Sequence, residues 1–172
     1  MTLTLILGGA RSGKTALAKR LAETRTAHPV IIATAEALDQ EMAERIALHR
    51  AERGETWRTV EAPLELVGAL QALPADAVAV VDCLTLWLSN LMLAERDVAA
   101  ETAGLIAALK GREVLLVANE VGLGIVPDNA LARRFRDDAG RMNQTLAAVC
   151  DQVVFVAAGL PLVMKGDPLT PG

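Results

Sequence analysis

The stretch best equipped to do chemistry lies at residues 8–15, which read GGARSGKT. Gly8, four further residues, and then Gly13, Lys14 and Thr15 complete the pattern G-x-x-x-x-G-K-[ST]. Glycines let the backbone curl until successive N–H groups point at phosphate oxygens. The lysine can reach the outer phosphates of a nucleotide, and the threonine hydroxyl can ligate Mg²⁺. The motif therefore predicts a loop that binds the phosphates of a nucleoside triphosphate.

The sequence on either side of this phosphate-binding loop supports the same interpretation. The apolar run LTLIL precedes it at residues 3–7, and the helix-forming run TALAKRLAE follows from Thr15. A helix that begins near Gly13 adds the positive end of its dipole to the phosphate site. The alternative is a glycine-rich turn with an unrelated lysine, and the strand-then-helix context argues against it.

A carboxylate ends another apolar run, AVAVVDCLT, in which Asp82 directly follows the hydrophobic residues. In nucleotide-binding proteins of this kind, an acidic residue at that place completes the Mg²⁺ shell, either directly or through water. An aspartate at the end of a strand can instead cap the following helix. Both roles stay open at this point, and the preceding apolar run together with the loop at Gly8 favours the metal.

A histidine lies among arginines in the helical segment DQEMAERIALHRAER, residues 39–53. Arg45, His49 and Arg53 are four apart and share a helix face, with Arg50 close by. Like charge lowers the pKa of such an imidazole and keeps it neutral and nucleophilic. A histidine that attacks the α-phosphorus of a nucleotide would form a phosphoramidate intermediate. The alternative is a solvated surface helix, which spacing alone favours.

The elements that must position these residues follow a regular alternation. Apolar, β-rich runs recur without polar alternation, so we expect strands buried on both faces, as in a parallel sheet. Segments of helical length and period separate them, which predicts an α/β fold of P-loop NTPase type, a mostly parallel sheet flanked by helices, as a single domain over residues 1–172. The expected strands lie at residues 3–7, 30–33, 77–81, 114–118 and 153–157.

Four further segments carry structural expectations. TWRTVEAP at residues 56–63 could add a short extra strand, and GLPLVMKG followed by DPLTPG suggests a poorly ordered end. A helix over Val98 to Leu109 is apolar enough to pack against either the core or a neighbouring subunit. Another helix starts after Pro127, Asp128 and Asn129. Its apolar stripe comprises Leu131, Phe135, Ala139, Met142, Leu146 and Val149.

Composition limits the classes of function. The net charge of −4, the absence of a basic run and an aromatic content of 2% argue against a nucleic-acid partner. No charge-free stretch reaches the ~18 residues that a membrane span needs, so we expect no membrane insertion. Cys83 and Cys150 lack metal-ligand spacing and are expected to be reduced and buried, as in a cytoplasmic protein.

Beyond these patterns, the sequence resembles the bifunctional adenosylcobinamide kinases and adenosylcobinamide-phosphate guanylyltransferases of cobalamin biosynthesis. The resemblance runs in consistent order from about residue 3 to residue 157. The block that begins NEVGLGIVP and the histidine helix are far more specific than the phosphate-binding loop. The matching stretches are GGARSGKT at 8, ATAEALDQEMAERIALHR at 33, WRTVEAP at 57, DCLTLWLSNLM at 82 and NEVGLGIVPDNALARRFRDDAGRMNQTLA at 119.

This resemblance implies two reactions. The enzyme would phosphorylate the aminopropanol hydroxyl of adenosylcobinamide with ATP or GTP. It would then take GMP from GTP onto His49, release pyrophosphate, and pass GMP to the new phosphate, giving adenosylcobinamide-GDP. His49 and Lys14 are the implied catalytic residues, with Mg²⁺ as the metal at Thr15 and Asp82. The resemblance also implies a homo-oligomer, of which a trimer is one form.

The nucleotide contacts carried over by the resemblance lie in five separate parts of the chain. Guanine recognition rests on the resemblance alone, because the Asn-Lys-x-Asp motif of switch GTPases is absent. Glu61, Asp82 and Glu120 are candidates for the base in the kinase step. The alternatives are a small-molecule kinase without guanylyltransferase activity and a non-enzymatic NTP-binding regulatory module. The implied contacts are Gly8, Gly9, Ala10, Arg11, Ser12, Gly13, Lys14, Thr15, Ala33, Thr34, Ala35, Arg50, Ala51, Glu52, Arg53, Glu61 and Asp82.

Overall fold

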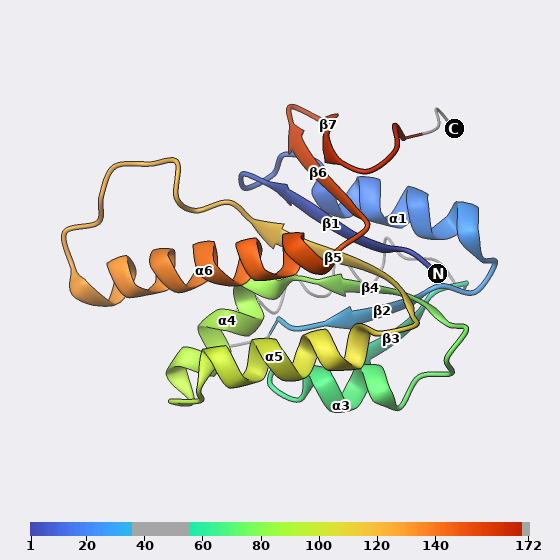
Figure 1. Ribbon diagram of the computed structural model, residues 1–172, viewed down its shortest axis with the longest axis horizontal. Coiled ribbons are helices and arrows are strands. Elements are labelled where there is room, and N and C mark those ends of the chain that lie inside the picture. Colours follow the sequence, from blue (N-terminus) through green and yellow to red (C-terminus); the bar gives the residue numbers. More distant parts are fainter. Residues whose placement is uncertain (36–55, 170–172) are drawn as a thin grey trace.

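The computed structural model describes residues 1–35 and 56–169, and its centre is a seven-stranded sheet in the order β3-β2-β4-β5-β1-β6-β7 (Figure 1). All neighbouring strands are parallel except β6 and β7. The five expected strands are confirmed: β2 has the expected bounds, β1 and β6 are one residue longer at one end, β5 is one residue longer at each end, and β4 is shifted by one residue. The strands are β1 Leu3–Gly8, β2 Val30–Ala33, β3 Arg58–Glu61, β4 Val78–Asp82, β5 Glu113–Asn119, β6 Gln152–Ala157 and β7 Leu160–Lys165.

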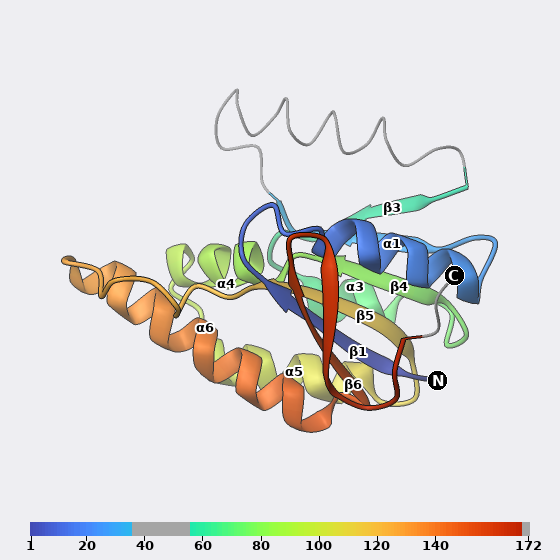
Figure 2. The ribbon, with the colours of Figure 1, turned by 90° about the horizontal axis from the view of Figure 1, so that it is seen from above.

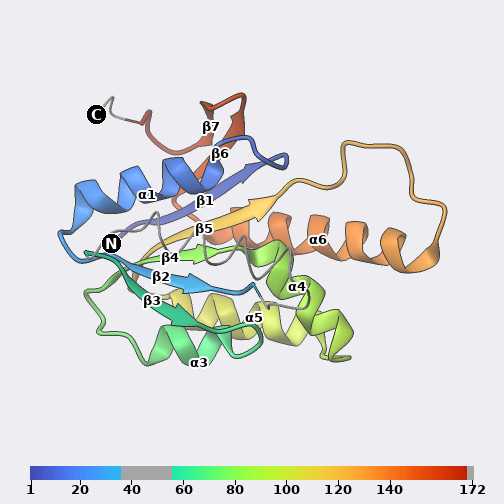
Figure 3. The ribbon, with the colours of Figure 1, turned by 180° about the vertical axis from the view of Figure 1, so that it is seen from behind.

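Helices cover both faces of this sheet, which explains why the central strands are apolar throughout. Among the described helices, α1 packs on one face, where Leu17 and Ala22 contact residues such as Val80 and Val117. The others pack on the opposite face, as the edge-on and rear views show (Figures 2 and 3). The helices are α1 Lys14–Arg25, α3 Leu66–Gln71, α4 Leu84–Leu93, α5 Val98–Leu109 and α6 Ala130–Val149.

The predicted start of α6 is confirmed, because Asn129 is its N-cap and accepts a 2.7 Å hydrogen bond from the Ala132 N–H. Its predicted apolar stripe is buried only in part. Met142 and its neighbours on that stripe lie in the core, whereas Leu131 is 64% exposed. The first turns of α6 extend past the edge of the sheet, where no strand lies beneath them (Figure 1).

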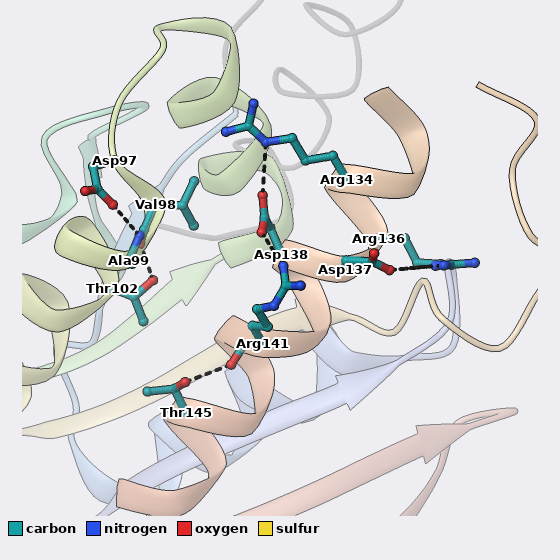
Figure 4. Close-up of polar contacts among 10 residues, drawn as sticks. All are labelled: Asp97, Val98, Ala99, Thr102, Arg134, Arg136, Asp137, Asp138, Arg141 and Thr145. Carbon is teal, nitrogen blue, oxygen red and sulfur yellow. Dashed lines mark hydrogen bonds and ion pairs between the residues drawn. The ribbon is translucent and has the colours of Figure 1, made fainter. Parts of the chain in front are cut away.

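Side chains fix the ends and the outer surface of the long helices. The Asp97 carboxylate caps α5 by accepting from the Ala99 N–H at 2.9 Å. On α6, Asp138 accepts from Arg141 at 2.9 Å and lies 3.5 Å from Arg134 (Figure 4). Such exposed pairs contribute only a few tenths of a kcal/mol each, roughly. The apolar faces therefore hold these helices on the sheet.

The short strand at residues 56–63 is confirmed as β3, which pairs with β2 in parallel register. The expectation of a poorly ordered end is wrong for residues 160–165, which form β7 and pair antiparallel with β6. A two-residue turn makes this hairpin possible, because Ala158 (φ +52°) and Gly159 (φ +78°) both adopt left-handed backbone conformations. Lys165 then donates hydrogen bonds of 3.0 and 3.1 Å to the last carbonyls of α6.

Two expectations from composition concern the state of the cysteines and the absence of a membrane span. Cys83 and Cys150 are both buried and unpaired, as predicted, and burial raises the pKa of the Cys150 thiol to about 11. Across residues 1–35 and 56–169, no helix combines the length and apolar character that crossing a bilayer requires.

Candidate nucleotide-binding site

Of the predicted site residues that the structure describes, Gly8, Ala33, Glu61 and Asp82 lie where parallel strands end. Gly8 of β1 pairs in register with Asn119 of β5, and Ala33 of β2 pairs with Asp82 of β4. Parallel strands that share a direction bring all these ends to one edge of the sheet. In open α/β sheets, ligands bind in the crevice beyond the carboxyl ends of the strands.

The phosphate-binding loop depends on glycine at two positions. Gly8 has φ +152°, and a Cβ there would lie 2.3 Å from the Val156 carbonyl oxygen. Gly13 has φ +102° and is the N-cap of α1, where no side chain makes a capping hydrogen bond. The first N–H groups of α1 are thus left for a ligand, in the arrangement that favours phosphate.

Lys14 is the first residue of α1, and its side chain is buried within the loop. Its ammonium group donates a 2.6 Å hydrogen bond to the Gly9 carbonyl oxygen. Burial lowers the pKa of Lys14, while the nearby Cys83 and Asp82 act in the opposite direction. A bound phosphate would supply the negative charge that a buried ammonium needs, so the site is electrostatically prepared for an anion.

Thr15 and Asp82, the predicted metal ligands, lie together. The Thr15 hydroxyl is 3.4 Å from an Asp82 carboxylate oxygen and donates to it. The N-cap of α4 is Cys83 and not Asp82, and Cys83 makes no side-chain capping hydrogen bond. Within the described residues, no three acidic, histidine or cysteine side chains cluster as a complete metal cage. One hydroxyl and one carboxylate nevertheless fit Mg²⁺, which takes its remaining ligands from water and phosphate.

Thr34 is fully buried, and its hydroxyl is occupied by the backbone of Cys83. It donates to the Cys83 carbonyl at 2.7 Å and accepts from the Cys83 N–H at 2.9 Å. Asn90 donates 2.9 Å hydrogen bonds to the carbonyls of Thr34 and Pro63. These contacts join β2 to the start of α4. Asn90 was not among the predicted site residues, although an amide inside the apolar run LTLWLSNLM indicates a buried hydrogen-bond partner.

A contact from the far end of the chain supports the phosphate-binding loop. The Gly159 N–H, in the turn between β6 and β7, donates a 2.8 Å hydrogen bond to the Ser12 carbonyl. A Cβ on Gly13 would lie 3.2 Å from the Gly159 Cα. The loop is thus packed against the turn of a hairpin that the sequence analysis did not predict.

The remaining predicted residues differ in their placement. Glu61 ends β3 and pairs in register with Ala33, so it lies on the same edge, two strands from Asp82. The Glu120 N–H donates to the Gly8 carbonyl at 3.0 Å, and its carboxylate accepts from the Gly122 N–H at 2.5 Å. His49 and the contacts predicted at Arg50, Ala51, Glu52 and Arg53 lie outside the described residues.

Comparison with known proteins places this site in a family. A family model described as cobinamide kinase / cobinamide phosphate guanyltransferase matches residues 4–164. The chain belongs to this family. The bifunctional adenosylcobalamin biosynthesis protein CobP of Pseudomonas aeruginosa is 49% identical to it, over 96% of this chain and 98% of that protein. The corresponding protein CobU of Escherichia coli is 40% identical, over 95% of this chain and 99% of its own length.

Solved structures at lower identity share the fold. The RadB recombinase superposes with a TM-score of 0.54 at 18% identity, covering 90% of this chain and 73% of that protein. The flagellar accessory protein FlaH of Methanocaldococcus jannaschii gives a TM-score of 0.53 at 13% identity, covering 96% and 79%. These likenesses confirm the predicted fold, a mostly parallel sheet flanked by helices.

Proposed function

We propose that this chain is a bifunctional enzyme that phosphorylates cobinamide, as its adenosyl form, and then transfers GMP from GTP to the product. The observation that carries the proposal is the nearly full-length match to the cobinamide kinase / cobinamide phosphate guanyltransferase family. The buried Lys14 and the glycine-dependent loop give the chain a site suited to the nucleotide that both reactions consume.

In the kinase step, the hydroxyl oxygen of cobinamide attacks the γ-phosphorus of ATP or GTP, and the bond to the β-phosphate oxygen breaks. Lys14 and the N–H groups at the start of α1 stabilise the charge on the transferred group. Thr15 and Asp82 are the residues that would hold Mg²⁺, which neutralises phosphate charge when bound. Asp82, Glu61 and Glu120 remain the candidates for receiving the hydroxyl proton.

In the transferase step, we assign the covalent role to His49. An imidazole nitrogen attacks the α-phosphorus of GTP, a nitrogen–phosphorus bond forms, and pyrophosphate leaves. The phosphate of the first product then attacks the same phosphorus and regenerates the imidazole. The support is the arginine-flanked helical spacing of residues 39–53 and the family resemblance, because this segment lies outside the described residues.

Labelling separates the two activities. Incubating the chain with α-labelled GTP should leave an acid-labile, base-stable label on the protein, which a His49→Ala variant should not acquire. The same variant should still phosphorylate cobinamide. Label that persists in His49→Ala contradicts the assigned residue. If the unaltered chain phosphorylates cobinamide but takes up no label, it is a kinase without guanylyltransferase activity.

Two broader features belong to the same proposal. We place the enzyme in the cytoplasm, supported by two cysteines that are buried and unpaired. A homo-oligomer, with a trimer as one form, rests on the family resemblance, and light scattering of the purified chain at several concentrations tests it. A mass equal to one chain at every concentration contradicts the oligomer and leaves the chemistry intact.

A further inference from the structure

A cavity of about 370 Å³ lies between α4 and α6, well apart from the phosphate-binding loop in sequence. Its volume falls in the range of small-molecule sites, which are mostly apolar with a few polar groups. Its walls follow that pattern: Met92 and Leu93 from α4, Leu131 and Phe135 from α6, with Ser89 and Asn129 as polar members.

Two of the apolar side chains that line this cavity are largely exposed to solvent. Leu93 is 67% exposed and Leu131 is 64% exposed. The segment that leads into α6, residues 120–129, also presents Ile125, which is 98% exposed. Exposed apolar side chains that line one cavity, as Leu93 and Leu131 do, often mark a binding site. We call this cavity the α4–α6 groove; it is lined by Ser89, Met92, Leu93, Asn129, Leu131, Ala132 and Phe135.

The α4–α6 groove belongs to the same end of the molecule as the phosphate-binding loop. The segment 120–129 starts at the loop itself, since the Glu120 N–H donates to the Gly8 carbonyl. It ends at Asn129, in the groove. On the other wall, α4 starts two residues after Asp82 and is ten residues long, about 15 Å. Both elements project from the carboxyl edge of the sheet (Figure 1).

This distance constrains what can occupy the groove. A molecule held there and phosphorylated at the loop must span roughly the length of α4 and must offer apolar surface to leucine, methionine and phenylalanine. A corrin macrocycle with a hydroxyl on a long side arm meets both requirements, and its peripheral amides can pair with Ser89 and Asn129.

We propose that the α4–α6 groove binds the corrin ring of the cobinamide substrate, with the hydroxyl-bearing arm directed along α4 toward Lys14. The inference rests on the proposed kinase function and adds to it the site of the second substrate. Binding energy from the ring would then position a hydroxyl that lies far from it, which is how remote contacts contribute to the rate of a chemical step.

Substitutions of exposed leucines test the groove without disturbing the core. Leu131→Ser and Leu93→Ser remove apolar wall, and Leu162→Ser on β7 is a matched control that is also 64% exposed. Equilibrium dialysis of the full chain against cobinamide, followed by corrin absorbance, gives the affinity directly. We expect about tenfold weaker cobinamide binding in each groove variant. The affinity of the groove variants for ATP should stay unchanged. The affinities of Leu162→Ser for cobinamide and for ATP should also stay unchanged.

The possible failures are distinguishable. Groove variants that bind cobinamide as tightly as the unaltered chain, or a Leu162→Ser control that weakens binding equally, overturn the groove and leave the kinase function standing. Groove variants that change only the molecular mass in light scattering would show that a second copy covers the groove, which also overturns it. An unaltered chain that neither binds nor phosphorylates cobinamide overturns the groove together with the proposed function.

Discussion

At the scale of single residues, the site depends on a charged group and a hydroxyl group that are buried away from solvent. Lys14 is buried and Thr34 is fully buried, yet each has backbone partners that compensate for the loss of hydration. The motif predicted Lys14 and its task, because the pattern specifies residue type and spacing together. The two hydrogen bonds of Thr34 with Cys83 join residues 49 positions apart, and no local pattern specifies them.

Nucleotide affinity should depend on pH through Lys14. Burial lowers the pKa of this ammonium below its ordinary 10.5, and a bound phosphate raises it again. Affinity for ATP should therefore be full below the lowered pKa and fall as the pH rises through it toward 10.5. Titration calorimetry across this range measures the effect. Lys14→Met should bind weakly at every pH, and Lys19→Met on the same helix should keep the original profile.

Thr34→Val should destabilise the fold. The valine fills the same space but leaves the Cys83 N–H and carbonyl without the hydroxyl, which costs about 1–3 kcal/mol of unfolding free energy. Urea denaturation gives this value. The control is Thr145→Val, whose exposed hydroxyl donates to the Arg141 carbonyl on the surface of α6 (Figure 4) and should matter little. Equal losses in the two variants would contradict the supporting role of Thr34.

At the scale of elements, the sheet could largely be predicted and the hairpin at its end could not. Buried parallel strands have continuous apolar runs, so their residue types alone indicate them. β7 instead alternates leucines with Pro161 and ends in Lys165, and it lies at an edge where proline is tolerated. Its turn also lacks the usual Asn-Gly signal, because alanine occupies the first left-handed position.

The turn between β6 and β7 should affect nucleotide binding. Gly159→Ala and Gly111→Ala introduce a methyl group at similar backbone angles, φ +78° and +68°, with no atom within 4 Å in either case. Each should lower the unfolding free energy by roughly 1 kcal/mol. Only Gly159 donates to Ser12, so only Gly159→Ala should also raise the KM for ATP. A KM that rises equally in both variants argues against a support role for this turn.

At the scale of the whole molecule, one sheet edge collects contributions from distant parts of the chain. The phosphate-binding loop, Asp82, Glu120 and the Gly159 turn come from four separate segments, and parallel pairing brings them together. The sequence predicted the first three as individual candidates. It could not show that residue 159 contacts residue 12, because the hairpin that creates this contact had no recognisable signal.

Because these segments are joined at the site, nucleotide binding should stabilise the entire chain. A ligand that binds only the folded state adds about 2.7 kcal/mol when present at 100 times its Kd. For a chain of this size, that corresponds to a rise in Tm of roughly 5–10 °C. Thermal unfolding with and without GTP measures the rise, and Lys14→Met at the same GTP concentration should lose it. A rise preserved in Lys14→Met would place the bound nucleotide elsewhere.

The two edge strands of the described sheet also affect whether the sheets of two molecules can pair edge to edge. β3 presents Arg58 and Glu61 at one border, and charged side chains discourage an incoming strand. At the opposite border, Pro161 has no N–H, so the row of donors along β7 is interrupted. An additional strand would therefore meet charge on one side and a missing donor on the other, which protects the sheet from growing into fibres.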